Sequence, residues 1–149
     1  MVDEKIKREF PSVQAVSCNM LLTYYESVNN KLPIIIDVRT DSEFRVSHLN
    51  DALHLESAEA VSDVIVERGL SKDAEIIVYC SVGYRSVSIA ADLIERGFIQ
   101  ALNLEHSLFE WVNKGYPMIR ESGSADKIHS FNKAWGVLID EFLHAYPDK

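Results

Sequence analysis

One cysteine and one arginine, five positions apart, carry the clearest chemical signal in this sequence. Cys80 follows an apolar segment, residues 75–79, that is typical of a buried strand. Arg85 precedes a segment, residues 86–96, that is typical of a helix. Backbone N–H groups at the start of a helix have no partner within the helix, so they favour an anion. Such a position favours the thiolate of Cys80, which is the nucleophilic form of a cysteine.

The loop between the strand and the helix fits the same chemistry. Gly83 permits a left-handed backbone conformation or a close approach of the backbone to a ligand. Arg85 adds a full positive charge at the end of the loop. We therefore predict that Cys80 is a reactive sulfur and not a core-filling residue. The predicted binding loop consists of Ser81, Val82, Gly83, Tyr84 and Arg85.

Alternating strand and helix signals surround this loop. The expected strands cover residues 15–16, 34–38, 53–55, 75–79 and 101–104, and the expected helices cover residues 18–28, 58–68, 86–96 and 106–114. Ser17 and Ser57 are predicted N-caps, and Gly69 and Gly97 are predicted helix stops. This alternation predicts an α/β fold with a mainly parallel central sheet. Ligands bind beyond the carboxyl ends of the strands in such sheets, which is where Cys80 stands.

Composition argues against several classes of function. The formal net charge of −8 argues against nucleic acid, and against an anionic membrane surface, as the main partner. Residues 1–9 contain no apolar run typical of a signal peptide, and no apolar stretch is long enough to cross a bilayer. A cytoplasmic location is therefore expected, and a disulfide between Cys18 and Cys80 is not.

Neither a metal nor another cofactor is predicted. The five histidines show no metal-ligand spacing, and the two cysteines lie far apart in the sequence. There is no Gly-rich loop of the nucleotide-binding type. Cys18 stands near a predicted helix start without a partner nearby in the sequence, so we interpret it as structural.

The length predicts one domain spanning residues 1–149, with a core at about 13–119. A linker-like segment, residues 120–126, follows that core. Apolar residues then recur at helical spacing over about 126–146. We expect this C-terminal helix to pack on the domain, and a partner-binding helix is the alternative.

Three ordered blocks resemble the single-domain rhodanese family, and together they cover roughly residues 13–119. The first block is residues 36–44, followed by His48 and Ala52; the second is residues 80–86; the third runs from Leu104 through Trp111 to Pro117. The resemblance implies a rhodanese fold, with helices on both faces of the sheet, and a sulfurtransferase site. Cys80 would accept a sulfane sulfur from a donor such as thiosulfate or polysulfide and hold it as a persulfide. A thiol or cyanide, or a thiol on a partner protein, would then remove it.

The resemblance also suggests roles for residues around the cysteine. The loop amides would hold the persulfide and the anionic donor, and Arg85 would orient the loop or meet that donor. Ser86, after the loop, is a supporting residue. Asp37 and Arg39 end a neighbouring strand, and we interpret both as structural: Asp37 would bind loop amides, and Arg39 would pair with Glu43.

Two other functions compete with sulfur transfer. Rhodanese-fold phosphatases and arsenate reductases have a similar fold, but their loop has five residues between cysteine and arginine. This chain has four, and Tyr79 stands where those phosphatases place a histidine. A shorter ring of donors suits a sulfur atom better than a tetrahedral phosphate. A non-catalytic rhodanese-like binding module is the other alternative, although loss of the cysteine would have signalled it.

Overall fold

The computed structural model describes residues 2–27 and 33–119. The expected C-terminal helix at 126–146 therefore lies outside the described residues. The strands are β1 (Ala15–Val16), β2 (Ile34–Asp37), β3 (Leu53–His54), β4 (Ile76–Tyr79) and β5 (Ala101–Leu104). The helices are α1 (Val2–Glu9), α2 (Cys18–Glu26), α3 (Asp41–Val46), α4 (Ala58–Glu67), α5 (Tyr84–Glu95) and α6 (Ser107–Asn113).

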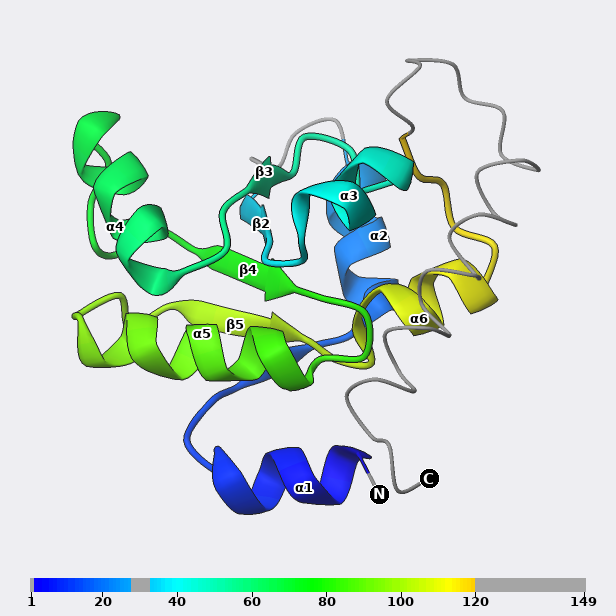
Figure 1. Ribbon diagram of the computed structural model, residues 1–149, viewed down its shortest axis with the longest axis horizontal. Helices are drawn as coiled ribbons and strands as arrows, with labels where there is room; N and C mark the ends of the chain where they lie inside the picture. The colour runs from blue at the N-terminus through cyan, green and yellow to red at the C-terminus, as the bar shows by residue number, and fades with distance from the viewer. Residues whose placement is uncertain (1, 28–32, 120–149) are drawn as a thin grey trace.

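The strands form one five-stranded sheet in the order β1-β5-β4-β2-β3, and every pairing in it is parallel (Figure 1). The prediction of a parallel α/β fold is therefore confirmed. The central strand is β4, which pairs with β2 on one side and β5 on the other. Cys80 follows β4 directly, so it lies at the carboxyl edge in the middle of the sheet, where parallel α/β proteins bind their ligands.

Alternation along β4 sends its side chains into two separate cores. Ile77 and Tyr79 pack with residues of α2 and α6, whereas Ile76, Val78 and Cys80 pack with residues of α4 and α5. Successive strand residues point to opposite faces of the sheet, so a strand that is buried on both faces has an uninterrupted apolar sequence. Helices cover both faces, as expected, with α4 and α5 on one side and α2 and α6 on the other (Figure 1). Cys80 belongs to the α5 side.

Two helices were not predicted. The first, α3, lies between β2 and β3 and has no buried residue, so no apolar periodicity marks it. Its sequence signal is a capping box: the hydroxyl of Thr40 accepts from the Glu43 N–H, and the Glu43 carboxylate accepts from the Thr40 N–H. The second, α1, contacts α5 near the loop, where the Tyr84 hydroxyl donates to Glu9 at 2.6 Å.

The predicted helix caps are confirmed where the structure describes them. Ser17 and Ser57 accept hydrogen bonds from backbone N–H groups in the first turns of α2 and α4. Gly69 follows α4 with a φ of +68°, as a helix-ending glycine requires. In the described part of the chain, no helix is long and apolar enough to cross a membrane.

Candidate active site

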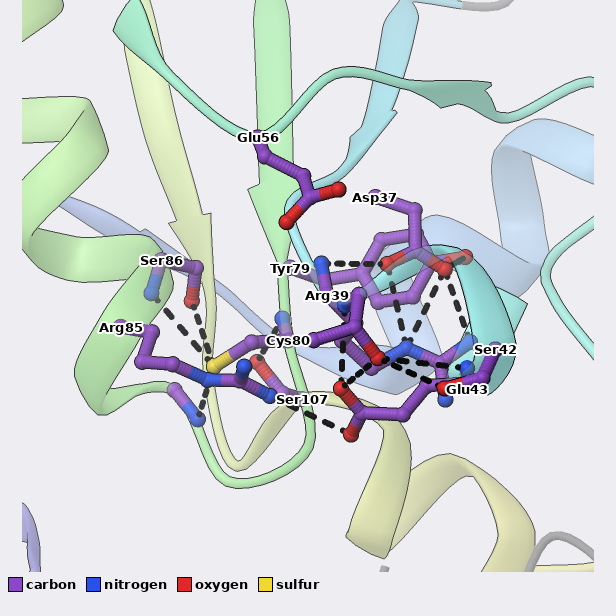
Figure 2. Close-up of polar contacts among 12 residues, drawn as sticks. Asp37, Arg39, Ser42, Glu43, Glu56, Tyr79, Cys80, Arg85, Ser86 and Ser107 are labelled. Atoms are coloured by element: carbon purple, nitrogen blue, oxygen red, sulfur yellow. Dashed lines mark hydrogen bonds and ion pairs between the residues drawn. The ribbon is translucent and has the colours of Figure 1, made fainter. Parts of the chain in front are cut away.

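The sulfur of Cys80 lies against the first turn of α5 (Figure 2). The Gly83 N–H and the Ser86 N–H donate to Sγ at 3.2 and 3.4 Å. Both donors come from the start of a helix, where N–H groups have no partner within the helix. Cys80 is only 1% exposed, but its sulfur lies against directed backbone dipoles as well as apolar side chains. Two backbone N–H groups are thus directed at the sulfur: Gly83 belongs to the predicted binding loop, whereas Ser86 was predicted as a supporting residue.

Gly83 makes this turn possible. It is the N-cap of α5 and has a φ of +100°, a conformation that disfavours every residue with a Cβ. A Cβ added there would lie 3.4 Å from Nδ2 of Asn103 and 3.6 Å from Oγ of Ser107. These distances are ordinary van der Waals contacts, so the left-handed φ is what favours glycine at this position, as the sequence suggested.

Ser86 and Asn103 form a buried polar pair that stabilises the loop, and the role of Asn103 was not predicted. The Ser86 hydroxyl donates to Oδ1 of Asn103 at 2.6 Å, and Nδ2 of Asn103 donates to the Gly83 carbonyl at 3.3 Å. The Ser86 oxygen also lies 3.4 Å from Sγ of Cys80, where it can accept from the thiol. Asn103 thus fixes two of the loop residues that surround the sulfur. A polar residue within the apolar strand 101–104 was the signal that could have indicated it.

The first residues of α6 also stabilise the loop, through hydrogen bonds to the backbone of Cys80. These contacts were not predicted either. The Cys80 N–H donates to Oγ of Ser107 at 3.3 Å, and the Leu108 N–H donates to the Cys80 carbonyl at 3.1 Å. His106 and Ser107 have φ values of 60° and 46°, two successive left-handed residues that are not glycine. Such strain persists only where surrounding contacts enforce it, and it clusters at functional sites.

Arg85 reaches across the site to α3. Its guanidinium lies 3.4 Å from Oε2 of Glu43, and the two side chains are 37% and 14% exposed (Figure 2). Beside it lies a cavity of about 400 Å³. The residues that line this cavity are Val38, Glu56, Tyr84, Arg85, Ser88 and Ile89. A small ligand in the cavity would therefore meet the guanidinium next to the loop.

Comparison with known proteins agrees with this geometry. Residues 22–114 match the model of the rhodanese-like domain family. The chain belongs to that family. A "Sulfurtransferase" of Allochromatium vinosum is 29% identical over 90 residues, which cover 60% of this chain and 81% of that protein. The "Thiosulfate sulfurtransferase GlpE" of Pseudomonas aeruginosa is 33% identical over 92 residues, which cover 62% of this chain and 80% of that protein.

Solved structures support the same fold. The solution structure of a rhodanese-like domain from Anabaena superposes with a TM-score of 0.61 at 23% identity, covering 71% of this chain and 78% of that one. At that identity the likeness concerns the fold alone. The rhodanese fold expected from the three sequence blocks is thereby confirmed.

Ser81, Val82 and Tyr84, the other predicted loop residues of this rhodanese-like domain, lie in three different environments. Ser81 is buried, and its carbonyl accepts from the Phe109 N–H at 2.7 Å. Val82 is 9% exposed. The Tyr84 ring stands between the site and α1, with the ammonium of Lys5 4.5 Å from its centre.

Asp37 and Arg39 form a buried ion pair at the end of β2. The guanidinium lies 2.8 Å from the Asp37 carboxylate, and the two side chains are 1% and 0% exposed. Burial alone lowers the pKa of Arg39, but the Asp37 carboxylate more than offsets this, and the pKa is raised. Oδ1 of Asp37 also accepts from the Arg39 N–H at 2.9 Å, as expected of an aspartate at a strand end.

The expected pairing of Arg39 with Glu43 is wrong. A buried guanidinium needs a buried anion, and Asp37 supplies one two residues away, whereas Glu43 belongs to α3 and faces Arg85. Arg39 also donates to the Ser47 carbonyl at 2.6 Å, and Tyr79 donates to the Asp37 carboxylate at 2.7 Å. Asp37 and Arg39 thus make structural contacts, with each other, with Ser47 and with Tyr79, on the side of the sheet away from Cys80. Among the described residues, no three His, Cys, Asp or Glu side chains gather as a metal site.

Cys18 lies on the other face of the sheet, with α2 and α6. Burial raises its pKa to about 12, so at pH 8 fewer than about one molecule in 1,000 carries a Cys18 thiolate.

We expect iodoacetamide at pH 8 to modify Cys80 in the folded protein and to leave Cys18 unmodified, as read by peptide mass spectrometry. Equal modification of the two thiols would contradict this, and unfolding in urea should make both reactive.

Proposed function

We propose that this rhodanese-like domain is a sulfurtransferase that works by double displacement through Cys80. The Cys80 thiolate attacks the outer sulfur of a donor such as thiosulfate or polysulfide. A sulfur–sulfur bond forms, the donor's own sulfur–sulfur bond breaks, and its electron pair leaves with sulfite or a shorter polysulfide. Cyanide or a thiolate, free or on a partner protein, then attacks the outer sulfur of the persulfide and regenerates the Cys80 thiolate.

One observation carries this proposal: two backbone N–H groups, from Gly83 and Ser86, are directed at the sulfur. Fixed donors of this kind stabilise an anion without having to reorganise, and both the thiolate and the persulfide are anions. The cavity beside Arg85 gives a donor a place next to the loop. Sulfurtransferase relatives, whose matched segments cover 81% and 80% of their own length, add support. A cytoplasmic location, where free thiols are kept reduced, suits the same chemistry.

The test is whether Cys80 gains a sulfur. The purified protein is incubated with thiosulfate, polysulfide or mercaptopyruvate, and its intact mass is recorded under non-reducing conditions. We expect a gain of one sulfur atom that peptide analysis assigns to Cys80 and that cyanide removes again. The proposal fails if no donor adds sulfur to Cys80, or if the added sulfur resides on Cys18.

A further inference from the structure

The charge of Arg85 is already balanced by a carboxylate that the fold holds in place. Oε1 of Glu43 accepts from the Thr40 N–H at 3.0 Å and from the Thr40 hydroxyl at 2.7 Å. This capping box leaves Oε2 to face the Arg85 guanidinium at 3.4 Å. Glu43 is only 14% exposed, so its charge is less screened by water than that of a surface residue. An incoming anion therefore meets an ion pair.

A second carboxylate, that of Glu56, lines the cavity itself. Figure 2 shows this carboxylate pointing from the end of β3 into the site. Its carboxylate lies 3.4 Å from Nε2 of His54, and the same nitrogen lies 2.6 Å from the Arg39 carbonyl. Among the described residues no lysine or arginine forms an ion pair with Glu56, and its side chain is 53% exposed.

Several other charged side chains among the described residues have partners of their own. Asp37 pairs with Arg39, and Asp41 pairs with Arg45. At Tyr84, the Lys5 ammonium faces the ring and the Glu9 carboxylate accepts from the hydroxyl. Of the described residues that line the cavity, Arg85 and Glu56 are charged, and Glu43 pairs with Arg85. These three side chains together carry one negative charge, in a protein whose formal net charge is −8.

From these charges we infer that the site selects a sulfur donor of low net charge, an alkyl persulfide, over dianionic thiosulfate. This inference rests on the proposed function. Repulsion grows with the charge of the ligand, so a dianion is disfavoured more than a monoanion or a zwitterion. The apolar side chains of Val38 and Ile89 in the cavity wall suit an alkyl group.

The chemical step is the same for both donors. The Cys80 thiolate attacks the outer sulfur of R–S–S⁻, the new sulfur–sulfur bond gives Cys80–S–S⁻, and the electron pair of the broken bond leaves as R–S⁻. With thiosulfate the leaving group is sulfite. No oxidant or reductant is consumed, so the two donors differ at this site in charge and in the group attached to the transferred sulfur.

The test compares loading rate constants of Cys80 for thiosulfate and for cysteamine persulfide, which carries one ammonium and one persulfide anion. Intact mass spectrometry follows single-turnover loading of the full chain. Because donors differ in intrinsic reactivity, the decisive quantity is how the ratio of the two constants changes between variants. Glu43→Gln keeps the capping box and removes one charge, and Glu56→Gln removes the other.

Each of these two variants should raise the thiosulfate constant about five- to tenfold relative to the persulfide constant. In the wild-type protein, added salt should raise the thiosulfate constant, because it screens repulsion. Arg85→Ala should shift the ratio the other way. Glu67→Gln is the matched control: this exposed residue ends α4, at the amino end of the strands, so the ratio should stay at the wild-type value.

The outcomes separate the two claims. If Cys80 loads from both donors and neither Glu43→Gln nor Glu56→Gln changes the ratio, the inference is overturned and the proposed function stands. A thiosulfate constant that falls with added salt would also overturn it, because that is the signature of attraction. If neither donor loads Cys80 in any variant, the proposed function fails and the inference fails with it.

Discussion

Replacing Cys80 by alanine is expected to abolish sulfur transfer and leave the fold in place. The sulfur is the only atom of the proposed reaction that forms and breaks bonds on the protein, so turnover should fall to the rate measured without enzyme. Its loss leaves the Gly83 and Ser86 N–H groups without their acceptor, which should cost about 1–3 kcal/mol of stability. Steady-state transfer from thiosulfate to cyanide, together with circular dichroism and urea unfolding, would measure both effects.

Two companion variants sharpen that experiment. Cys80→Ser keeps an acceptor for the two N–H groups but cannot form a persulfide, so it should be inactive and better folded than the alanine variant. Cys18→Ala removes the buried sulfur on the other face of the sheet and should retain transfer. Normal turnover in either Cys80 variant would refute the assignment of the nucleophile.

The largest loss of stability is expected from Asp37→Ala. The substitution leaves the Arg39 guanidinium buried without its anion, and breaking a buried pair in this way costs about 3–5 kcal/mol. It also removes the acceptor of the Tyr79 hydroxyl, which is itself buried. The free energy of unfolding from urea titrations is the measurement.

A surface ion pair provides the comparison. Asp41→Ala breaks the pair between Asp41 and Arg45, whose side chains are 64% and 62% exposed, and should cost no more than about 1 kcal/mol. If Asp37→Ala cost as little as Asp41→Ala, the buried pair would not stabilise the fold as we describe.

The sequence was sufficient to predict the strand, loop and helix around Cys80, because each signal there is local. An apolar run predicts β4, a glycine permits the turn, and apolar periodicity predicts α5. The position of the sulfur at the carboxyl edge of the sheet then follows from the alternation of strands and helices. The rhodanese fold could be expected on the same residues.

The partners of the loop could not be predicted, because they come from distant segments. Glu43 precedes Arg85 by 42 positions, and Asn103 follows Ser86 by 17. Only the folded chain brings such residues together. The wrong pairing of Arg39 has a different cause: Glu43 is a nearby carboxylate in the sequence, but the guanidinium of Arg39 pairs with Asp37, two residues earlier. The short helix α3 was missed because none of its residues is fully buried, so it has no apolar periodicity.

Because Tyr79 and Cys80 point to opposite sides of the sheet, the proposed reaction at Cys80 depends on the exact length of β4. The phenol on one side anchors Asp37 and the Leu49 N–H, and the sulfur on the other side meets the amides of α5. A single inserted or deleted residue within the strand would exchange these two sides. The thiol would then lie in the hydrophobic core beneath α2 and α6. The phenol would lie against the backbone N–H groups at the start of α5. Substitutions that keep the strand length should therefore be tolerated in this segment far more readily than any change in that length.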